Sequence, residues 1–283
     1  MGRAMRIRAG YQITFDCMAP TPMMLMLSVH PSLEKDLETP DTLVASSGAQ
    51  TRSFIDLHGN RCTRLLAPPG PTTLSADFVI HSDGLPDPVL PDARLAPIDE
   101  LPDEAVVYLM SSRYCETDRM SDLAWSLFGH TEPGWARVQA IVDYVHDRIT
   151  FGYHHARPTK SALEAYDEQQ GVCRDFAHLA ITLCRCMNVP ARYCTGYLGD
   201  IGVPPPHDTM DFAAWFEVFL GGRWHTFDAR NNTPRIGRVL IARGRDAADV
   251  ALSSTFGPNT LGSFRVWTEE VTARRRAGAD SIA

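Results

Sequence analysis

Residues 171–181 read Gly-Val-Cys-Arg-Asp-Phe-Ala-His-Leu-Ala-Ile, a glycine followed by a cysteine and a long apolar run. Glycine is typical of the end of one segment, and the apolar run predicts a helix from Cys173 to Met187, ended by Pro190. The first N–H groups of a helix have no partner within it, and its dipole places positive charge there. Both effects favour a thiolate, so the sequence predicts a nucleophilic cysteine at a helix start.

Predicted helices precede this stretch, and predicted strands follow it. Before it, apolar residues recur at helical spacing between Trp135 and Ile149. After it, strands at 212–220 and 223–228 flank Gly221-Gly222, which is typical of a two-residue hairpin turn. Further helices are predicted at 103–110, 121–128 and 161–166, and further strands at 191–198 and 266–271, the last of which would close the sheet. This part of the chain is therefore predicted to be α+β with an antiparallel sheet.

The hairpin turn predicts which residues face each other. It pairs Leu220 with Arg223, and so sets Trp215 opposite Asp228 and His225 opposite Val218. Alternation then predicts an apolar face that forms the core, made of Ala214, Phe216, Val218 and Leu220. The other face is mixed and is expected to look toward the Cys173 helix; it carries Ala213, Trp215, Glu217, Trp224, Thr226 and Asp228.

The first third of the chain has the pattern of strands. Residues 7–15 and 74–80 alternate between apolar and polar, and Gly59-Asn60 divides residues 54–66 into a hairpin. The fold class is therefore α+β, with an antiparallel β-sandwich at 1–82 followed by a second domain at 103–272. Between them, residues 83–102 carry five prolines and are predicted to be a linker. Residues 273–283, with Arg274-Arg275-Arg276, are predicted to be a disordered tail.

Composition and cysteine spacing indicate which classes of protein the sequence does not favour. The 283 residues carry a net charge of −7 with basic residues scattered, which does not favour nucleic-acid binding. No apolar segment is long enough for a signal peptide or a membrane span. The seven cysteines form no CxxC pair and have no zinc-site spacing, so a cytoplasmic protein without metal is expected. Calcium-binding acidic loops and nucleotide-binding glycine loops are also missing, and the sequence predicts no cofactor. It favours no particular oligomeric state.

The motifs resemble those of a known family. Residues 171–178 with Asn-Val-Pro-Ala-Arg-Tyr at 188–193 and Gly-Tyr at 196–197, then Ala-Trp-Phe-Glu-Val at 214–218 and Trp-His-Thr-Phe-Asp at 224–228, look like the bacterial transglutaminase-like superfamily. The resemblance covers about residues 135–232, and the β-rich start resembles the extra domain of such proteins. It implies a papain-like fold and a Cys-His-Asp triad that acts on amides, by transfer to an amine or to water.

In such a triad the cysteine attacks a carbonyl, the histidine moves the proton and the aspartate orients the imidazole. The resemblance makes Cys173 the nucleophile and Asp228 the orienting residue. The histidine of the family directly precedes the Ala-Trp pair, and here that position is Ala213. The catalytic triad is therefore altered, because a thiol without an imidazole lacks both a base and the acid for the leaving amine.

Other histidines are alternatives for the missing base. His207 lies in a loop shortly before the strand at 212–220 and is the first choice. His225 faces the core side of the hairpin, away from Asp228. His178 lies more than a turn along the cysteine helix and is interpreted as structural. His154 and His155 are interpreted as solvent-facing or structural.

Two residues are candidates for substrate binding, and each has a structural alternative. Trp215 would shield the site or donate its indole N–H, although a core tryptophan would show the same pattern. Gln170 would line the pocket for the developing oxyanion, although glutamine is common near loops. Cys173 itself would be a core cysteine without its surrounding motif, and Asp228 could be a turn former.

Three functions are compatible with these residues. The first is a cysteine enzyme that hydrolyses or transfers amides of peptide or protein substrates, with Cys173, Asp228 and His207 as catalytic residues. The second is an impaired module that keeps the cleft and binds a peptide or protein. The third, ranked last, is a redox or scaffold protein that uses Cys184, Cys186 and Cys194.

Overall fold

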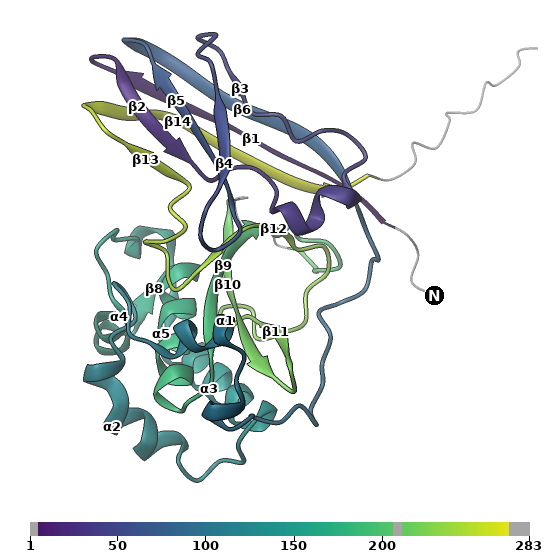
Figure 1. The fold of residues 1–283 in the computed structure, drawn as a ribbon, viewed down its shortest axis with the longest axis vertical. Coiled ribbons are helices and arrows are strands. Elements are labelled where there is room, and N and C mark those ends of the chain that lie inside the picture. Colours follow the sequence, from purple (N-terminus) through teal and green to yellow (C-terminus); the bar gives the residue numbers. More distant parts are fainter. Residues whose placement is uncertain (1–4, 206–210, 272–283) are drawn as a thin grey trace, which may run out of the picture.

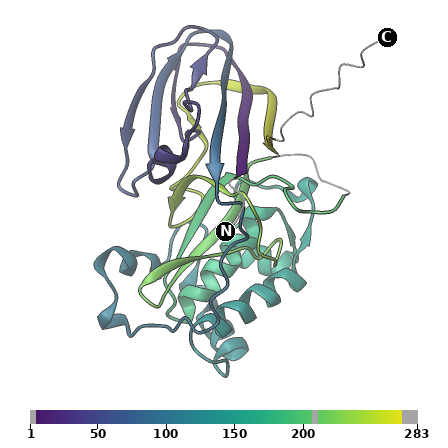
Figure 2. The same ribbon diagram turned by 90° about the vertical axis from the view of Figure 1, so that its right-hand side faces the viewer.

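Two stacked four-stranded antiparallel sheets lie above a layer of helices packed on a third four-stranded sheet (Figure 1). The structure is a computed structural model and describes residues 5–205 and 211–271. Seen from the side, the sandwich and the helical part form two distinct units joined by several chain crossings (Figure 2). The predicted fold class, a β-sandwich followed by a papain-like α+β domain, is confirmed.

The sandwich has strand orders β14-β1-β6-β3 and β13-β2-β5-β4. Alternate residues of β1 are buried, including Ile7, Ala9 and Tyr11, as the period-two pattern predicts. The hairpin at Gly59-Asn60 is also confirmed, because β4 pairs with β5 and Gly59 has φ +83°. The strands of this unit are β1 (Met5–Cys17), β2 (Thr21–Leu25), β3 (Val44–Ala45), β4 (Arg52–Ile55), β5 (Arg61–Ala67), β6 (Gly70–Ser82), β13 (Ser253–Thr255) and β14 (Asn259–Glu270).

The C-terminal strands correct one prediction. Residues 266–271 were expected to close the second sheet, but β14 pairs with β1, from Ile7–Glu270 to Cys17–Asn259. Alternation shows that a segment is a strand, but it does not show which sheet accepts it. Residues 253–270 therefore lie in the sandwich, while the domain bounds 1–82 and 103–272 stay predictions. The predicted tail at 273–283 lies outside the described residues.

The helices surround a central one. In α5, every residue from Asp175 to Cys186 is buried, which explains its long apolar run. Helix α3 starts at Trp135 as predicted, whereas α2 starts four residues earlier than predicted. The helices are α1 (Asp103–Val106), α2 (Thr117–Phe128), α3 (Trp135–Arg148), α4 (Ala162–Glu168) and α5 (Cys173–Cys186), with 3-10 turns η1 (Pro31–Asp36), η2 (Ile98–Glu100), η3 (Val107–Leu109) and η4 (Tyr153–His155). Among the described helices, none is long and apolar enough to cross a membrane.

The sheet beside α5 has the order β11-β10-β9-β12. The predicted hairpin register is confirmed, since Leu220 pairs with Arg223 and Val218 with His225. The strands of this unit are β9 (Ala191–Tyr197), β10 (Ala213–Leu220), β11 (Arg223–Phe227) and β12 (Val239–Gly244), with a short parallel pair β7 (Thr150–Phe151) and β8 (Gln170–Gly171).

The orientation of this sheet corrects a second prediction. The mixed face was expected to look toward the Cys173 helix, but Phe227 of the opposite face packs on Trp135 of α3, with ring centroids 4.5 Å apart. The mixed face instead meets the sandwich, where Trp215 clusters with Leu33 of η1. Alternation separates two faces and does not identify their neighbours, so the sequence alone left this choice open.

Candidate active site

Helix α5 begins at Cys173 because of the residues on either side. Val172 is extended, and its N–H donates to the Asp175 carboxylate at 2.9 Å, so the third helical residue caps the helix. Gly171 is required for this cap, because a Cβ there would lie 2.6 Å from Oδ2 of Asp175. The cysteine therefore occupies the first helical position, as predicted.

Cys173 is only partly buried as a residue, but its thiol is buried and is not in an environment that ionises it. All seven cysteines lie in the described ranges, and Cys173 alone among them is not buried at the level of the whole residue. Burial of the thiol, together with the Asp211 and Asp228 charges, raises the pKa of Cys173 to about 11, although Arg230 and a backbone hydrogen bond with Ala214 act to lower it. The thiol is therefore protonated near neutral pH, and the helix start does not by itself produce a thiolate.

Asp228 lies directly after β11, where its carboxylate is almost enclosed. Oδ2 accepts hydrogen bonds from Nδ2 of Asn231 at 2.7 Å and from Nη2 of Arg238 at 2.9 Å, and Oδ1 accepts one from the Asn231 N–H at 3.0 Å. Burial acts to raise the pKa of the Asp228 carboxyl, but the Arg238 charge and the Asn231 hydrogen bonds outweigh it and hold that pKa below its ordinary value. Asp228 is therefore ionised at neutral pH.

Ala213 is the first residue of β10 and is half-buried. Its neighbour Ala214 makes the backbone hydrogen bond with the Cys173 thiol, whereas Ala213 itself packs against the cluster of Cys194, Trp215 and Leu240. The position that the resemblance gives to the family histidine is thus one residue from a backbone partner of Cys173, and its methyl group has no acid–base function.

The histidines considered as alternative bases make contacts elsewhere where the structure describes them. His225 donates from Nε2 to the Leu220 carbonyl at 3.0 Å and packs edge-on against Trp135, on the core side as predicted. His178 accepts from the Ala247 N–H at 3.1 Å and is fully buried, which agrees with its structural interpretation. His154 and His155 stack on each other in η4. His207 lies outside the described residues, and its role as base stays a prediction.

The two predicted substrate-binding residues have different surroundings. Trp215 is 3% exposed and packs against Cys194 and Leu240, so its ring belongs to the core of the sheet's mixed face. Gln170 lies in β8, three residues before Cys173, and its backbone carbonyl accepts from Nζ of the buried Lys160 at 2.9 Å. A binding role for either side chain stays a prediction.

Sequence reasoning missed Arg230. Its guanidinium lies 3.8 Å from the centre of the Phe151 ring, and Phe151 pairs in turn with Gly171, two residues before Cys173. The stacking places a positive charge at the start of α5. The signal available in the sequence was the Asp-Ala-Arg spacing after β11, which puts an arginine two residues beyond Asp228.

Replacing Arg230 with glutamine is expected to slow alkylation of Cys173 at a fixed alkaline pH. Arg230 lowers the pKa of the thiol, so its removal raises that pKa and reduces the thiolate, by up to about tenfold for one pKa unit. Iodoacetamide labelling across a pH series, with the modified peptide mapped by mass spectrometry, measures the effect. Arg230→Lys keeps the charge and is the control; equal slowing in both variants would contradict an effect of charge.

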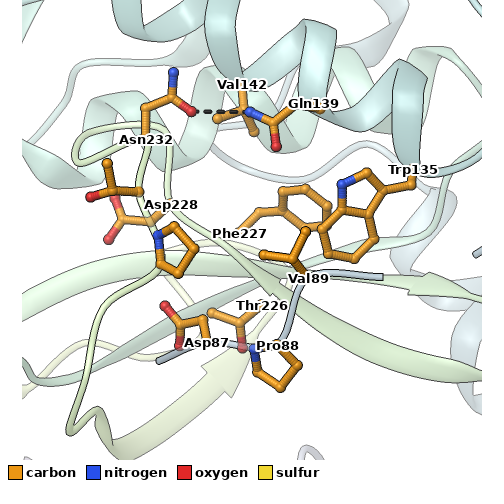
Figure 3. A pocket seen from close by; sticks show the side chains of 12 residues that line it. Asp87, Pro88, Val89, Trp135, Gln139, Val142, Thr226, Phe227, Asp228 and Asn232 are labelled. Atoms are coloured by element: carbon orange, nitrogen blue, oxygen red, sulfur yellow. Dashed lines mark hydrogen bonds between the residues drawn. The ribbon is translucent and has the colours of Figure 1, made fainter. Parts of the chain in front are cut away.

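A pocket of about 80 Å³ lies next to Asp228 (Figure 3). Asp87, Pro88 and Val89 of the linker form one wall, and Trp135, Gln139 and Val142 of α3 form another. Cys173 does not line it, so this pocket lies beside the Asp228 carboxylate and not over the Cys173 thiol. Within the described residues, no group of three or more His, Cys, Asp or Glu side chains could hold a metal ion.

Comparisons with known proteins agree with this geometry. Residues 122–229 match a family model described as the transglutaminase-like superfamily. A solved structure from Cytophaga hutchinsonii, named as a candidate cysteine protease, is 30% identical and superposes with a TM-score of 0.82 over 96% of this chain and 92% of that chain. The chain belongs to the transglutaminase-like superfamily. Because the superposition covers nearly all of both chains, the sandwich and the transglutaminase-like unit occur together in both proteins.

Mycobacterial relatives match shorter parts of this transglutaminase-like protein. An uncharacterized protein of Mycobacterium leprae is 34% identical over 120 residues, which is 41% of this chain and 39% of the relative. Another from Mycobacterium bovis is 38% identical over 92 residues, or 29% of each chain. The matched part of the chain therefore spans less than half the length of these relatives.

Proposed function

We propose that this protein is a cysteine enzyme that acts on amide bonds of peptide or protein substrates, by hydrolysis or by acyl transfer. The observation that carries the proposal is the placement of Cys173 at the start of α5, within electrostatic reach of a buried, ionised Asp228. A nucleophile and an orienting carboxylate in that arrangement are two of the three groups that amide cleavage through a thioester needs.

The chemical steps assign a role to each group. Sγ of Cys173 gives up its proton and forms a bond to the carbonyl carbon, which places negative charge on the carbonyl oxygen. The N–H groups of Cys173 and Arg174, the first two residues of α5, have no partner among the described residues and can stabilise that charge. The C–N bond then breaks as the leaving amine takes a proton, and water or a second amine cleaves the resulting thioester.

Proton transfer is the step that Ala213 cannot perform. We assign it to His207, which lies six residues before Ala213 in the sequence. An imidazole from this segment would accept the thiol proton and deliver it to the leaving amine. Oδ1 of Asp228 accepts a single hydrogen bond among the described residues, so it can accept another from an imidazole N–H.

Replacing His207 with alanine is expected to reduce turnover about 10²–10⁴-fold, the usual contribution of a general base. Cleavage of a defined peptide mixture, followed by mass spectrometry, measures turnover, and circular dichroism checks the fold. His130→Ala is the matched control, because His130 is exposed after α2. Equal turnover in the wild type and the His207 variant would remove His207 from the site.

A second candidate function is a peptide- or protein-binding module without turnover. Two observations favour it: the Cys173 pKa of about 11 and the hydrogen bonds that Arg238 and Asn231 already make to Asp228. The pH midpoint of Cys173 alkylation distinguishes the two, with Cys173→Ala as the control. A midpoint well below the free-thiol value of about 8.5 supports the enzyme, and a midpoint above it supports the binding module.

A further inference from the structure

Arg238 lies between two carboxylates from distant parts of the chain. Its Nη2 donates to Oδ2 of Asp228 at 2.9 Å, and its Nε lies 2.9 and 3.1 Å from the two carboxylate oxygens of Asp87. The guanidinium also lies 5.0 Å from the centre of the Trp215 ring, and only 8% of the side chain is exposed. Arg238 therefore connects the orienting aspartate to the linker.

Asp87 is held in place by the backbone. Its N–H donates to the Arg235 carbonyl at 2.9 Å, and its Oδ2 accepts from the Arg235 N–H at 2.9 Å. Pro86 and Ile236 form a β-bridge beside it. The predicted linker is thus fixed to the segment that carries Arg238, and Figure 3 shows Asp87 close to Asp228 in the wall of the same pocket.

The contacts of Arg238 compensate for the burial of the Asp228 carboxylate. Burial of an ionised carboxyl is costly unless an opposite charge and hydrogen bonds compensate it. Arg238 supplies the charge. Its hydrogen bond to Asp87 and its contact with the Trp215 ring restrict the position of its guanidinium. Because Arg238 and Nδ2 of Asn231 both bind Oδ2, they fix the carboxylate's rotation and leave Oδ1 as the oxygen for a further donor.

We propose that Arg238 is a positioning residue of the active site, which keeps Asp228 ionised and in one orientation, and that Asp87 of the linker anchors Arg238. The inference rests on the proposed role of Asp228 as the orienting residue. It makes the segment between the two units part of the active-site scaffold.

The test is a titration of the Asp228 carboxyl carbon by NMR, in the full chain labelled with ¹³C-aspartate. Asp228→Asn identifies the signal. Arg238→Met is expected to increase the proton affinity of Asp228 at least tenfold, and Arg238→Lys, which keeps the charge but cannot bridge both carboxylates, is expected to give a smaller increase. The other charged groups around this site are Arg235, Arg230, Asp200 and Asp87, with the Cys173 thiol beside them, and none of these is changed in the Arg238 variants. An unaltered titration in the Arg238 variants would overturn the proposal.

A coupling measurement separates positioning from general stability. Arg238→Lys is expected to change the pH profile of Cys173 alkylation in the wild-type background and to leave it unchanged in an Asp228→Asn background. Equal changes in both backgrounds would show that Arg238 acts on Cys173 without Asp228. If the Arg238→Met variant does not fold, the Asp228 titration and the coupling measurement are both made on Arg238→Lys.

A separate measurement tests whether Asp87 anchors Arg238. Asp87→Ala, which removes both acceptor oxygens, is expected to expose the Arg238 Nε–H to exchange, seen as loss of its ¹⁵N signal at neutral pH. A retained, slowly exchanging signal would overturn the role of Asp87. These measurements need no turnover, so an inactive protein with a shifted Asp228 titration would contradict the proposed enzyme and still support the role of Arg238.

Discussion

In a His207→Ala background, amide turnover is expected to rise about 10²–10⁴-fold when Ala213 is replaced by histidine, because the variant supplies a general base at the position of the family histidine. Position 213 begins β10 next to Ala214, whose backbone is bonded to the Cys173 thiol. Among the described residues Oδ1 of Asp228 accepts one hydrogen bond, so it can accept another from an imidazole N–H. The imidazole would also lower the pKa of Cys173, because a thiolate and an imidazolium stabilise each other.

Two variants in the same background test whether the gain comes from the imidazole. Ala213→Gln adds a side chain of similar size without a base and is expected to leave turnover unchanged. Asp228→Asn in the Ala213→His background is expected to remove most of the gain, since the imidazole loses its orienting partner. Turnover by peptide cleavage and the alkylation midpoint are measured together. A folded protein with Ala213→His in the His207→Ala background, and with neither a faster reaction nor a lower midpoint, would show that an imidazole at position 213 does not act on Cys173.

The parts of the site that the sequence predicts are those governed by local rules. The start of α5 follows from glycine and an apolar run, and the pairing of β10 with β11 follows from a two-residue turn and alternation. Such rules act over a few residues. They place Cys173, Ala213 and His225 correctly on their elements before any tertiary contact is known.

The parts that the sequence does not predict depend on long-range contacts. The strand β14 could pair with either unit, and only the fold places it beside β1. The charge on Cys173 depends on its burial and on Arg230, Asp211 and Asp228 together, so the helix-start argument alone predicts the wrong direction for its pKa. The partnership of Asp87 with Arg238 joins residues 151 positions apart.

Replacing Glu217 with alanine is expected to destabilise the protein by about 3–5 kcal/mol, the usual cost of removing one partner from a buried ion pair. Oε2 of Glu217 accepts from Nε of Arg192 at 2.7 Å and lies 3.2 Å from Nε of Arg243. All three side chains are largely buried, so the alanine variant leaves two arginines without their anion. Urea unfolding followed by circular dichroism measures the free energy of unfolding, and Glu104→Ala on the exposed side of α1 is the matched control.

The surroundings of Glu217 indicate a structural role for this residue of the motif. Although it belongs to the Ala-Trp-Phe-Glu-Val motif, it lies on the sheet face that meets the sandwich, close enough to act on His30 of that unit. Burial and the charges of Arg243 and Arg192 lower the pKa of His30 to about 4. His30 is therefore neutral at neutral pH and is not a third positive charge beside Glu217. Glu217→Ala should therefore lower stability and leave the pH midpoint of Cys173 alkylation unchanged in the folded protein. A shifted midpoint with unchanged stability would place Glu217 in the active site instead of the interface between the units.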